Sequence, residues 1–355
     1  MQKATRRNVS AAWAGSLLAA CVLSGGAVIA FDGAGSPANA SERSLENARG
    51  GGSADGSCSV ETLDVPEGTT DSWVAAGSPD GNKLVGYATV DGEERPMTWS
   101  NGKPREILVD LRNVSPAGVN DEGVVAGFGF EHDEPVRTSF LYRDGETIEL
   151  AAPEGADATV TDINADGDAV GYGVGDNSAL RWDFDSPDEV EKLPSPQENA
   201  VANAIDDGGT AAGHTGFPDE GTEAALWNQD GGHEALPALD GAKHSSVESI
   251  RGDFATGFST DSMENSTQAL WNLEEGTVSQ LPDSLYEAYD VNETGVVAAD
   301  TEDDHAAIVR DGEVVTLPHA GGDASQAYTI ADDDTAAGSS QDAAGNSQAV
   351  VWSGC

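Results

Sequence analysis

The sequence is poor in basic residues. Its 355 residues include 17 lysines and arginines but 63 aspartates and glutamates, which gives a formal net charge of −46 at pH 7. A protein that binds a phosphate backbone needs a basic footprint, so this charge balance argues against nucleic-acid binding. It also argues against contact with an anionic membrane surface. Solubility in a salty or variable exterior is a sufficient explanation for such acidity.

The familiar motifs of catalysis and cofactor binding are missing as well. The six histidines show no His-Glu-x-x-His spacing, and no pair of closely spaced cysteines is available for zinc. The chain has no Gly-x-Ser-x-Gly motif, P-loop or dinucleotide fingerprint. A glycosidase needs only two carboxylates at the right separation, and the acids are too numerous to nominate a pair. We predict no catalytic residue and no cofactor, and leave calcium binding open.

The N-terminal segment is typical of exported proteins. A basic stretch (Lys3–Arg7) precedes an apolar stretch over 11–31, and Ala38-Asn39-Ala40 offers a small-x-small cleavage pattern. We therefore predict a signal peptide over residues 1–40 and a flexible linker over 41–57, followed by a secreted protein. Without the signal the chain keeps 14 basic and 62 acidic residues, a net charge of −48.

Cysteine is scarce, with three residues in the whole chain. Cys21 completes a Leu-Ala-Ala-Cys sequence that resembles a lipobox, so lipid attachment at Cys21 is an alternative to cleavage. A retained membrane anchor over 11–31 is a second alternative, because the apolar stretch can just span a bilayer. In the exported chain only Cys58 and Cys355 remain, and an oxidising exterior favours a disulfide between them.

A sequence repeat of about 40 residues occurs seven times between Cys58 and Cys355. Each copy has an apolar strand, an Asn-type turn, a Gly-aromatic strand and an Ala-Leu-Trp-like strand, as in Thr147–Trp182. Three marker series advance in parallel. They are the third-strand ends at Trp99, Tyr142, Trp182, Trp227, Trp271, Val309 and Trp352; the second-strand positions Gly86, Gly127, Gly171, Gly213, Gly257, Ala299 and Gly338; and the leucines Leu63, Leu108, Leu150, Leu193, Leu236, Leu281 and Leu317.

A period of 40–45 residues with four short strands is typical of propeller blades. The third strands are continuously apolar, as expected when neighbouring blades cover both faces, so the repeated tryptophans are predicted to pack between blades. The seventh copy has three strands, and Ser59–Pro66 matches the missing fourth. We predict an all-β fold over residues 58–355: a seven-bladed β-propeller of four-stranded antiparallel blades, the last blade closed by the N-terminal strand.

Two short motifs are predicted to be turns. Asn164–Asp168 looks like the start of a calcium loop, but it lacks the acid at position 12, and a strand follows at once. Arg251-Gly252-Asp253 spells an adhesion tripeptide at the position where other copies turn, and one tripeptide has little specificity.

The unit Val160–Trp182 (VTDINADGDAVGYGVGDNSALRW) is similar to the HAF-type extracellular repeats of bacteria. Their pattern is Ile-Asn-x-x-Gly-x-Val-Val-Gly-Tyr followed by His-Ala-Phe-Leu-Trp. The similarity extends over 58–355, although the sixth copy has Ala299 for the glycine and Val309 for the tryptophan, and the fifth lacks the Asn-x-x-Gly turn. The resemblance implies secretion and a β-propeller-like repeat. It implies no activity and transfers no catalytic residue.

The loops between the second and third strands vary most and are acidic. They emerge on one face of a propeller, where their fields add and where binding functions concentrate. We predict a secreted or cell-surface, monomeric, non-catalytic binding module for an extracellular protein or glycan. The alternative is an extracellular polysaccharide-acting hydrolase or lyase that uses carboxylates of this face. The candidate rim comprises Glu93, Glu94, Glu131, His132, Asp133, Asp219, Glu220, Asp261, Glu264, Asp303, Asp304 and His305.

Overall fold

The computed structural model describes residues 58–355 apart from 134, 198, 218 and 264. The predicted signal peptide, the linker and Cys21 therefore lie outside the described residues. All elements of the described part are β-strands, and it contains no helix able to span a membrane. The 28 strands are β1 (Ser59–Thr62), β2 (Thr69–Gly77), β3 (Lys83–Val90), β4 (Glu93–Ser100), β5 (Lys103–Glu106), β6 (Arg112–Val119), β7 (Val125–Phe130), β8 (Arg137–Arg143), β9 (Glu146–Glu149), β10 (Asp157–Ile163), β11 (Ala169–Val174), β12 (Ala179–Trp182), β13 (Glu191–Lys192), β14 (Ala200–Ile205), β15 (Ala211–Phe217), β16 (Gly221–Trp227), β17 (His233–Ala235), β18 (Ala242–Arg251), β19 (Phe254–Asp261), β20 (Ser266–Asn272), β21 (Thr277–Gln280), β22 (Leu285–Val291), β23 (Val297–Thr301), β24 (Ala306–Arg310), β25 (Glu313–Thr316), β26 (Ser325–Ile330), β27 (Ala336–Gln341) and β28 (Ser347–Ser353).

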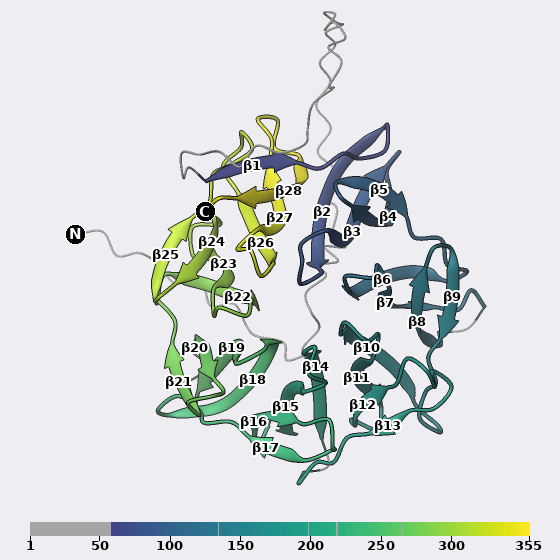
Figure 1. The fold of residues 1–355 in the computed structure, drawn as a ribbon, viewed down its shortest axis with the longest axis vertical. Coiled ribbons are helices and arrows are strands. Elements are labelled where there is room, and N and C mark those ends of the chain that lie inside the picture. The colour runs from purple at the N-terminus through teal and green to yellow at the C-terminus, as the bar shows by residue number, and fades with distance from the viewer. Residues whose placement is uncertain (1–57, 134, 198, 218, 264) are drawn as a thin grey trace, which may run out of the picture.

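These strands form four-stranded antiparallel sheets of the β-propeller type, arranged around a common centre with the first strand of each sheet facing it (Figure 1). Four sheets follow chain order: β2–β5, β6–β9, β10–β13 and β22–β25. The groups β14–β17 and β18–β21 are joined by one parallel pair, Thr222 with His244. The last sheet has the order β1-β28-β27-β26, so the first strand pairs with the last. Each sheet of the described chain is open, and none closes into a barrel.

Close approach of two backbones explains the repeated glycine. In the sheet β10–β13 the register shifts between Val160 and Asp162, which marks a β-bulge at Thr161, and Gly171 pairs with Val160. A Cβ on Gly171 would lie 1.9 Å from the carbonyl oxygen of Thr159, so a side chain cannot fit. The same bulge recurs in the first strand of every sheet, opposite the same marker position.

The repeated tryptophans pack between sheets, as predicted. Each is almost completely buried, and its indole nitrogen donates a hydrogen bond to a backbone carbonyl in the connection that leads in from the preceding sheet. The five bonds, 2.7–2.8 Å long, join Trp99 to Asp64, Trp182 to Ala151, Trp227 to Pro194, Trp271 to Pro237 and Trp352 to Pro318. Tyr142 and Val309 are buried at the corresponding positions without this bond.

The hydrophobic core is divided among the contacts between neighbouring sheets. One cluster joins Leu141 of β8 to Leu180 of β12, for example. Another joins Val74 and Trp99 of the sheet β2–β5 to Ala349 of β28. Because every sheet packs on two neighbours, including the first on the last, no sheet exposes a large apolar face to solvent.

The leucine series needs one correction, in the sheet β2–β5. Leu108 is 68% exposed, whereas Ile107 is 3% exposed and its amide bonds to the carbonyl of Pro96. Leu150 makes the equivalent bond to Ser139 in the next sheet, so Ile107 occupies the marker position and Leu108 was wrongly assigned. Adjacent aliphatic residues are indistinguishable by type, and only the strand register separates them.

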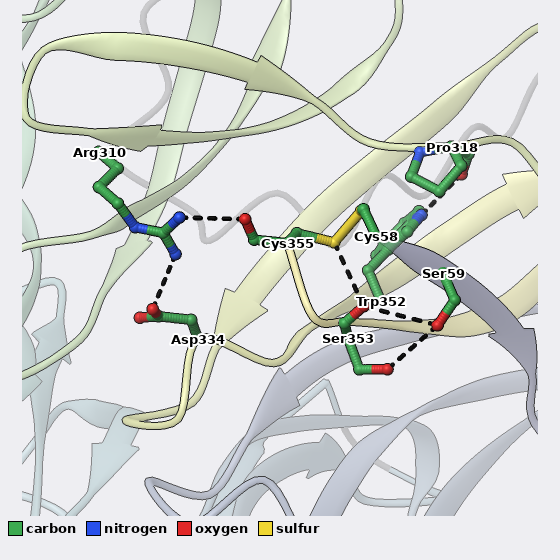
Figure 2. The surroundings of a disulfide bond; sticks show 8 residues. All are labelled: Cys58, Ser59, Arg310, Pro318, Asp334, Trp352, Ser353 and Cys355. Atoms are coloured by element: carbon green, nitrogen blue, oxygen red, sulfur yellow. Dashed lines mark hydrogen bonds and ion pairs between the residues drawn. A yellow bond between two sulfur atoms is a disulfide. The ribbon is translucent and has the colours of Figure 1, made fainter. Parts of the chain in front are cut away.

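A disulfide joins Cys58 to Cys355, the first and last described residues, which confirms the predicted pairing (Figure 2). Beside it, Ser59 pairs with Ser353 at the start of the β1–β28 ladder. Arg310 of β24 donates to the carbonyl of Cys355 at 3.0 Å and to Asp334 at 2.7 Å. The C-terminal residue is thus held by a covalent bond and by the neighbouring sheet.

We expect the Trp227→Phe variant to lose about 1 kcal/mol of unfolding free energy, because the partly buried hydrogen bond to the Pro194 carbonyl is then lost. Urea unfolding measures the loss. Trp73→Phe is the matched control, since the Trp73 indole stacks on Tyr87 and makes no such bond. Equal losses in both variants would show that the ring, and not the hydrogen bond, provides the stability.

We expect Cys58→Ser to destabilise the fold by up to roughly 4–5 kcal/mol, because the crosslink spans 297 residues and restricts the unfolded chain. Thermal unfolding of the variant and of the wild type, with and without reductant, measures this effect. Reductant should shift only the wild type. An unchanged melting temperature in the variant would contradict a stabilising role for the disulfide.

Candidate functional site

The described rim residues lie on five loops that each join the second to the third strand of a sheet, or at the strand ends that flank these loops. Antiparallel order places these loops at the same end of every sheet as the connection that enters its first strand. Most of the rim side chains are exposed, and Glu264 lies outside the described residues. By loop, Glu93 and Glu94 begin β4, Glu131, His132 and Asp133 follow β7, Asp219 and Glu220 follow β15, Asp261 ends β19, and Asp303, Asp304 and His305 follow β23.

The rim is a set of separate loops and not one compact cluster. Asp261 organises its own loop: its carboxylate accepts bonds from the Asn265 side chain and from the amides of Asn265 and Met263, which lower its pKa. His132 Nε2 lies 3.3 Å from Asp110. The His305 ring stacks edge-on against His319, with 4.7 Å between centroids. Within the described residues, no group of three or more His, Cys, Asp or Glu side chains could hold a metal ion.

The two ends of the sheets differ in how their acids are neutralised. At the opposite end, where first and second strands and third and fourth strands join, arginines pair with four turn acids. These pairs are Arg105–Asp144, Arg143–Glu122, Arg251–Asp207 and Arg310–Asp334. No described rim carboxylate forms an ion pair with lysine or arginine. The loop end has ion pairs of its own, Lys192–Asp176 and Arg95–Glu106, and Arg112 and Lys243 donate to the backbone carbonyls of Glu131 and Asp219. The candidate rim carboxylates themselves keep their negative charge.

A second group of polar residues, missed by the sequence analysis, lies on the first strands near the centre of the ring. In the sheets β14–β17 and β18–β21 the residues at the bulge positions are Asn203 and Glu248. Ser246 donates to Glu248 Oε1 at 2.8 Å, and Asn203 Nδ2 lies 3.3 Å from the same oxygen. His214 Nδ1 is 3.1 Å from the Ser246 oxygen. The four side chains form one connected network between two sheets.

The next two sheets continue this group. Asp300 of β23 accepts hydrogen bonds from Tyr289 at 2.9 Å and from Gln326 at 3.0 Å, and the amide of Ala327 lies 3.3 Å from its other oxygen. Tyr328 donates to Gln326 at 2.6 Å, and its ring meets that of Tyr289 edge-on. Side chains of neighbouring sheets are thus linked through one buried carboxylate.

Burial raises the pKa of the inner carboxylates. Burial among protein atoms raises the pKa of Glu248 to about 7, and repulsion from the neighbouring Glu287 carboxylate adds to the rise. Burial also raises the pKa of Glu287 and that of Asp300, the latter to about 6 despite its hydrogen bonds. The pKa of Asp162, which caps the amide of Ile205, rises to about 7 for the same reason.

One signal in the sequence points to part of this group. The residue after the second-strand glycine is aromatic in four copies, as in Tyr87 and Phe128. His214 and Asp300 depart from that pattern, and both are polar residues that contact the first strand of the following sheet. Glu248 has no comparable signal, because an acid is common throughout this chain.

Arg251 is a mostly buried residue at the end of β18, and Gly252-Asp253 forms the tight turn to β19, as predicted. Burial acts to lower its pKa, but the surrounding carboxylates of Asp290, Asp162 and Asp207 outweigh burial and raise it. Because these acids surround the guanidinium group, this tripeptide does not present an extended, exposed arginine for adhesion.

Comparisons with known proteins bear on the fold only. No protein-family model matches the chain, and no curated protein matches it. The β-propeller domain of the Trilobed protease from Pyrococcus furiosus, whose topology is described as open velcro, is 11% identical with a TM-score of 0.55 over 81% of this chain and 95% of that one. The virginiamycin B lyase of Staphylococcus aureus is 11% identical (TM-score 0.54; 83% and 99%), and the oligogalacturonate lyase of Vibrio parahaemolyticus is 13% identical (0.53; 83% and 97%). These likenesses show the propeller architecture and not an activity.

We expect stability to fall as pH rises from about 4 to 7, because Asp162, Glu248 and Asp300 bind protons more tightly in the folded state than in the unfolded chain. Their contribution is complete at low pH and is lost above their folded pKa values. Thermal unfolding at pH 5 and pH 8 tests this. Glu248→Gln should remove about 1–3 kcal/mol of the difference by mimicking the protonated acid. Asp303→Asn, on an exposed loop, is the control, and equal pH dependence in Glu248→Gln and the wild type would contradict the assignment.

Proposed function

We propose that this chain is an exported, non-catalytic binding module, whose ligand is a basic protein surface that engages the acidic loop face. We further propose that its 28 strands make a seven-bladed ring closed by the N-terminal strand. The pairing of β1 with β28, the packing of the sheet β2–β5 on the last sheet and the disulfide between Cys58 and Cys355 support the closure. Membership of the HAF-type repeat proteins and cleavage after Ala40 remain part of this proposal, and the disulfide is consistent with export.

The exposed rim carboxylates carry the functional proposal, because they lack a basic partner even though the loop end has the ion pairs Lys192–Asp176 and Arg95–Glu106. Arginines pair with turn acids at one end, whereas the described rim carboxylates have no lysine or arginine partner. Unpaired charges on exposed loops do not reduce solubility. Several negatively charged loops around a rigid ring create a field that attracts a positively charged partner. Such a field increases association rates and selects basic partners over acidic ones.

We expect a lysine-rich peptide to bind the protein from Ser41 onward, with an affinity that falls as salt increases, whereas a glutamate-rich peptide should not bind. The double variant Asp303→Asn, Asp304→Asn should weaken binding roughly three- to tenfold, mainly through slower association. Fluorescence anisotropy and stopped-flow measurements read out both quantities.

Asp253→Asn is the matched control for this experiment, because Asp253 is an exposed acid at the turn end. It should bind the lysine-rich peptide like the wild type. Equal weakening by the turn and rim variants would indicate a non-specific effect of net charge, and the loop face would lose its special role.

An extracellular polysaccharide-acting hydrolase or lyase is the second candidate, and the raised pKa values of Glu248 and Asp300 favour it. A carboxyl group that stays protonated near neutral pH can serve as a general acid. Both residues lie on first or second strands near the centre, where loops of several sheets could position a substrate. Turnover of a polysaccharide that disappears in Glu248→Gln would replace the binding proposal with this one.

A further inference from the structure

A cavity of about 410 Å³ lies in the sheet β18–β21, at the loop end, and no function has yet been assigned to it. This volume is within the range of small-molecule sites. Strands β18 to β21 contribute to its wall, together with the connection that enters β18. The wall combines hydroxyl, amide and carboxylate groups (Ser259, Thr260, Thr267, Gln280, Asp240 and Asp261) with aliphatic side chains (Ala238, Leu239, Ala242 and Val278).

Strand register places the polar wall residues on a rigid support. Ser259 of β19 is directly opposite Thr267 of β20, so their side chains share one face of the sheet. Gln280 of β21 is opposite Ala269, two residues further along β20, and therefore shares that face. The three side chains form a row across adjacent strands, with Val278 as an apolar neighbour.

Ser259 has an unmet hydrogen-bonding capacity in this wall. The residue is 3% exposed, and its hydroxyl oxygen has no hydrogen-bond partner in the described structure. A buried hydroxyl without a partner is costly, so such groups are normally satisfied by a neighbour, water or a ligand. Ser259 lines the cavity, so rotation of its side chain would bring the hydroxyl to a hydroxyl-bearing ligand there.

The composition of the wall restricts the ligand class. Among the described residues that line the cavity none is basic, and two are acids, which disfavours phosphates, sulfates and uronic acids. Asp261 is already occupied by its own loop, so a metal ion would find few free ligands. Gln280 Nε2 already donates to Asp283, which leaves its Oε1 as an acceptor. Three hydroxyls, this amide oxygen and the Asp240 carboxylate beside aliphatic carbons match a ring whose hydroxyl groups donate bonds and whose C–H face is apolar.

We propose that this cavity is a binding site for a neutral saccharide of one or two rings. The proposal rests on the binding role proposed for the loop face, because Asp261 belongs to both. It adds a second ligand class to that face: the rim attracts a basic partner by charge, whereas the cavity selects a small polyhydroxylated ring by hydrogen bonds and shape.

The test is isothermal titration of the mature protein with maltose, cellobiose, lactose and trehalose, and with digalacturonic acid as the acidic counterpart. At least one neutral disaccharide should bind with a dissociation constant in the micromolar to low millimolar range, and digalacturonic acid should bind at least about tenfold more weakly. Thr267→Val and Gln280→Ala should each weaken binding about threefold to thirtyfold, since each removes one or two hydrogen bonds. Gln280 is exposed, so its variant should fold normally.

Thr277→Val is the matched control, because Thr277 is an exposed residue of the same strand, β21, outside the cavity wall. It should bind the disaccharide like the wild type. Absence of binding by all four neutral disaccharides, equal binding of digalacturonic acid, or unchanged affinity in both cavity variants would overturn the proposal. The lysine-rich peptide separates the two proposals: if it binds while every disaccharide fails, only the saccharide site is lost, and the reverse result removes only the basic partner.

Discussion

The contact between successive sheets is the constraint on which the structure depends. A single four-stranded sheet of this chain has apolar residues on both faces and cannot bury them alone, so each sheet is stable only between two neighbours. The indole of Trp182 illustrates how the contact is made: its ring fills the space between sheets, and its nitrogen satisfies the carbonyl of Ala151 in the incoming connection. One side chain thus fills the space between the sheets and donates a hydrogen bond to a backbone carbonyl, which explains why five of the copies have tryptophan at this position.

The same contact requires the backbones to approach closely. A bulge in each first strand bends it around the centre and brings a carbonyl against the second strand, where Gly171 and the glycines of five other sheets leave no Cβ in the way. Ala299, with the smallest side chain, takes this position in the sheet β22–β25. The bulge also re-aims one residue per sheet. Ala117 at this position is small, whereas Glu248 and Tyr289 enter polar networks with their neighbours. A rigid repeat therefore carries a variable inner surface, and the loops at one end form a variable outer one.

Charge then distinguishes the two ends of the ring. Arg105, Arg143 and Arg310 pair with acids in the turns, so the negative potential there is partly cancelled. The loops that bear Glu93 or Asp303 have no such partners. Basic residues occur at both ends, as the Lys192–Asp176 pair at the loop end shows, so the electrostatic difference comes from the rim carboxylates that have no lysine or arginine partner. Recognition by charge and recognition by hydrogen bonds in the cavity beside Ser259 are therefore compatible on one face.

The repeat could be recognised in the sequence because the contact between sheets requires particular residue types at regular intervals. Tryptophan, glycine and the Asn-Gly turn each meet a local requirement in most copies, so their spacing predicted the strands, the propeller architecture and the partnership of Cys58 with Cys355. Where neighbouring residues meet the local requirement equally well, the predicted position of the buried residue was wrong by one. Ile107 and Leu108 are equally apolar, and only the hydrogen bond to Pro96 identifies the buried one. The network around Glu248 was not predicted, because nothing in the sequence distinguishes Glu248 from the other acids among a total of 63.

The sequence by itself determined the period, the strand types and the acidity of the loops, since these follow from local stereochemistry and composition. Only the tertiary structure decided which carboxylates are enclosed by protein, which acids face an arginine and where a cavity remains. Those properties depend on residues about 40 positions apart in the chain, such as Asp290 and Thr329, whose side chains meet at 2.8 Å across neighbouring sheets. A raised pKa or an unmet hydrogen bond arises from this three-dimensional surrounding and not from the residue type.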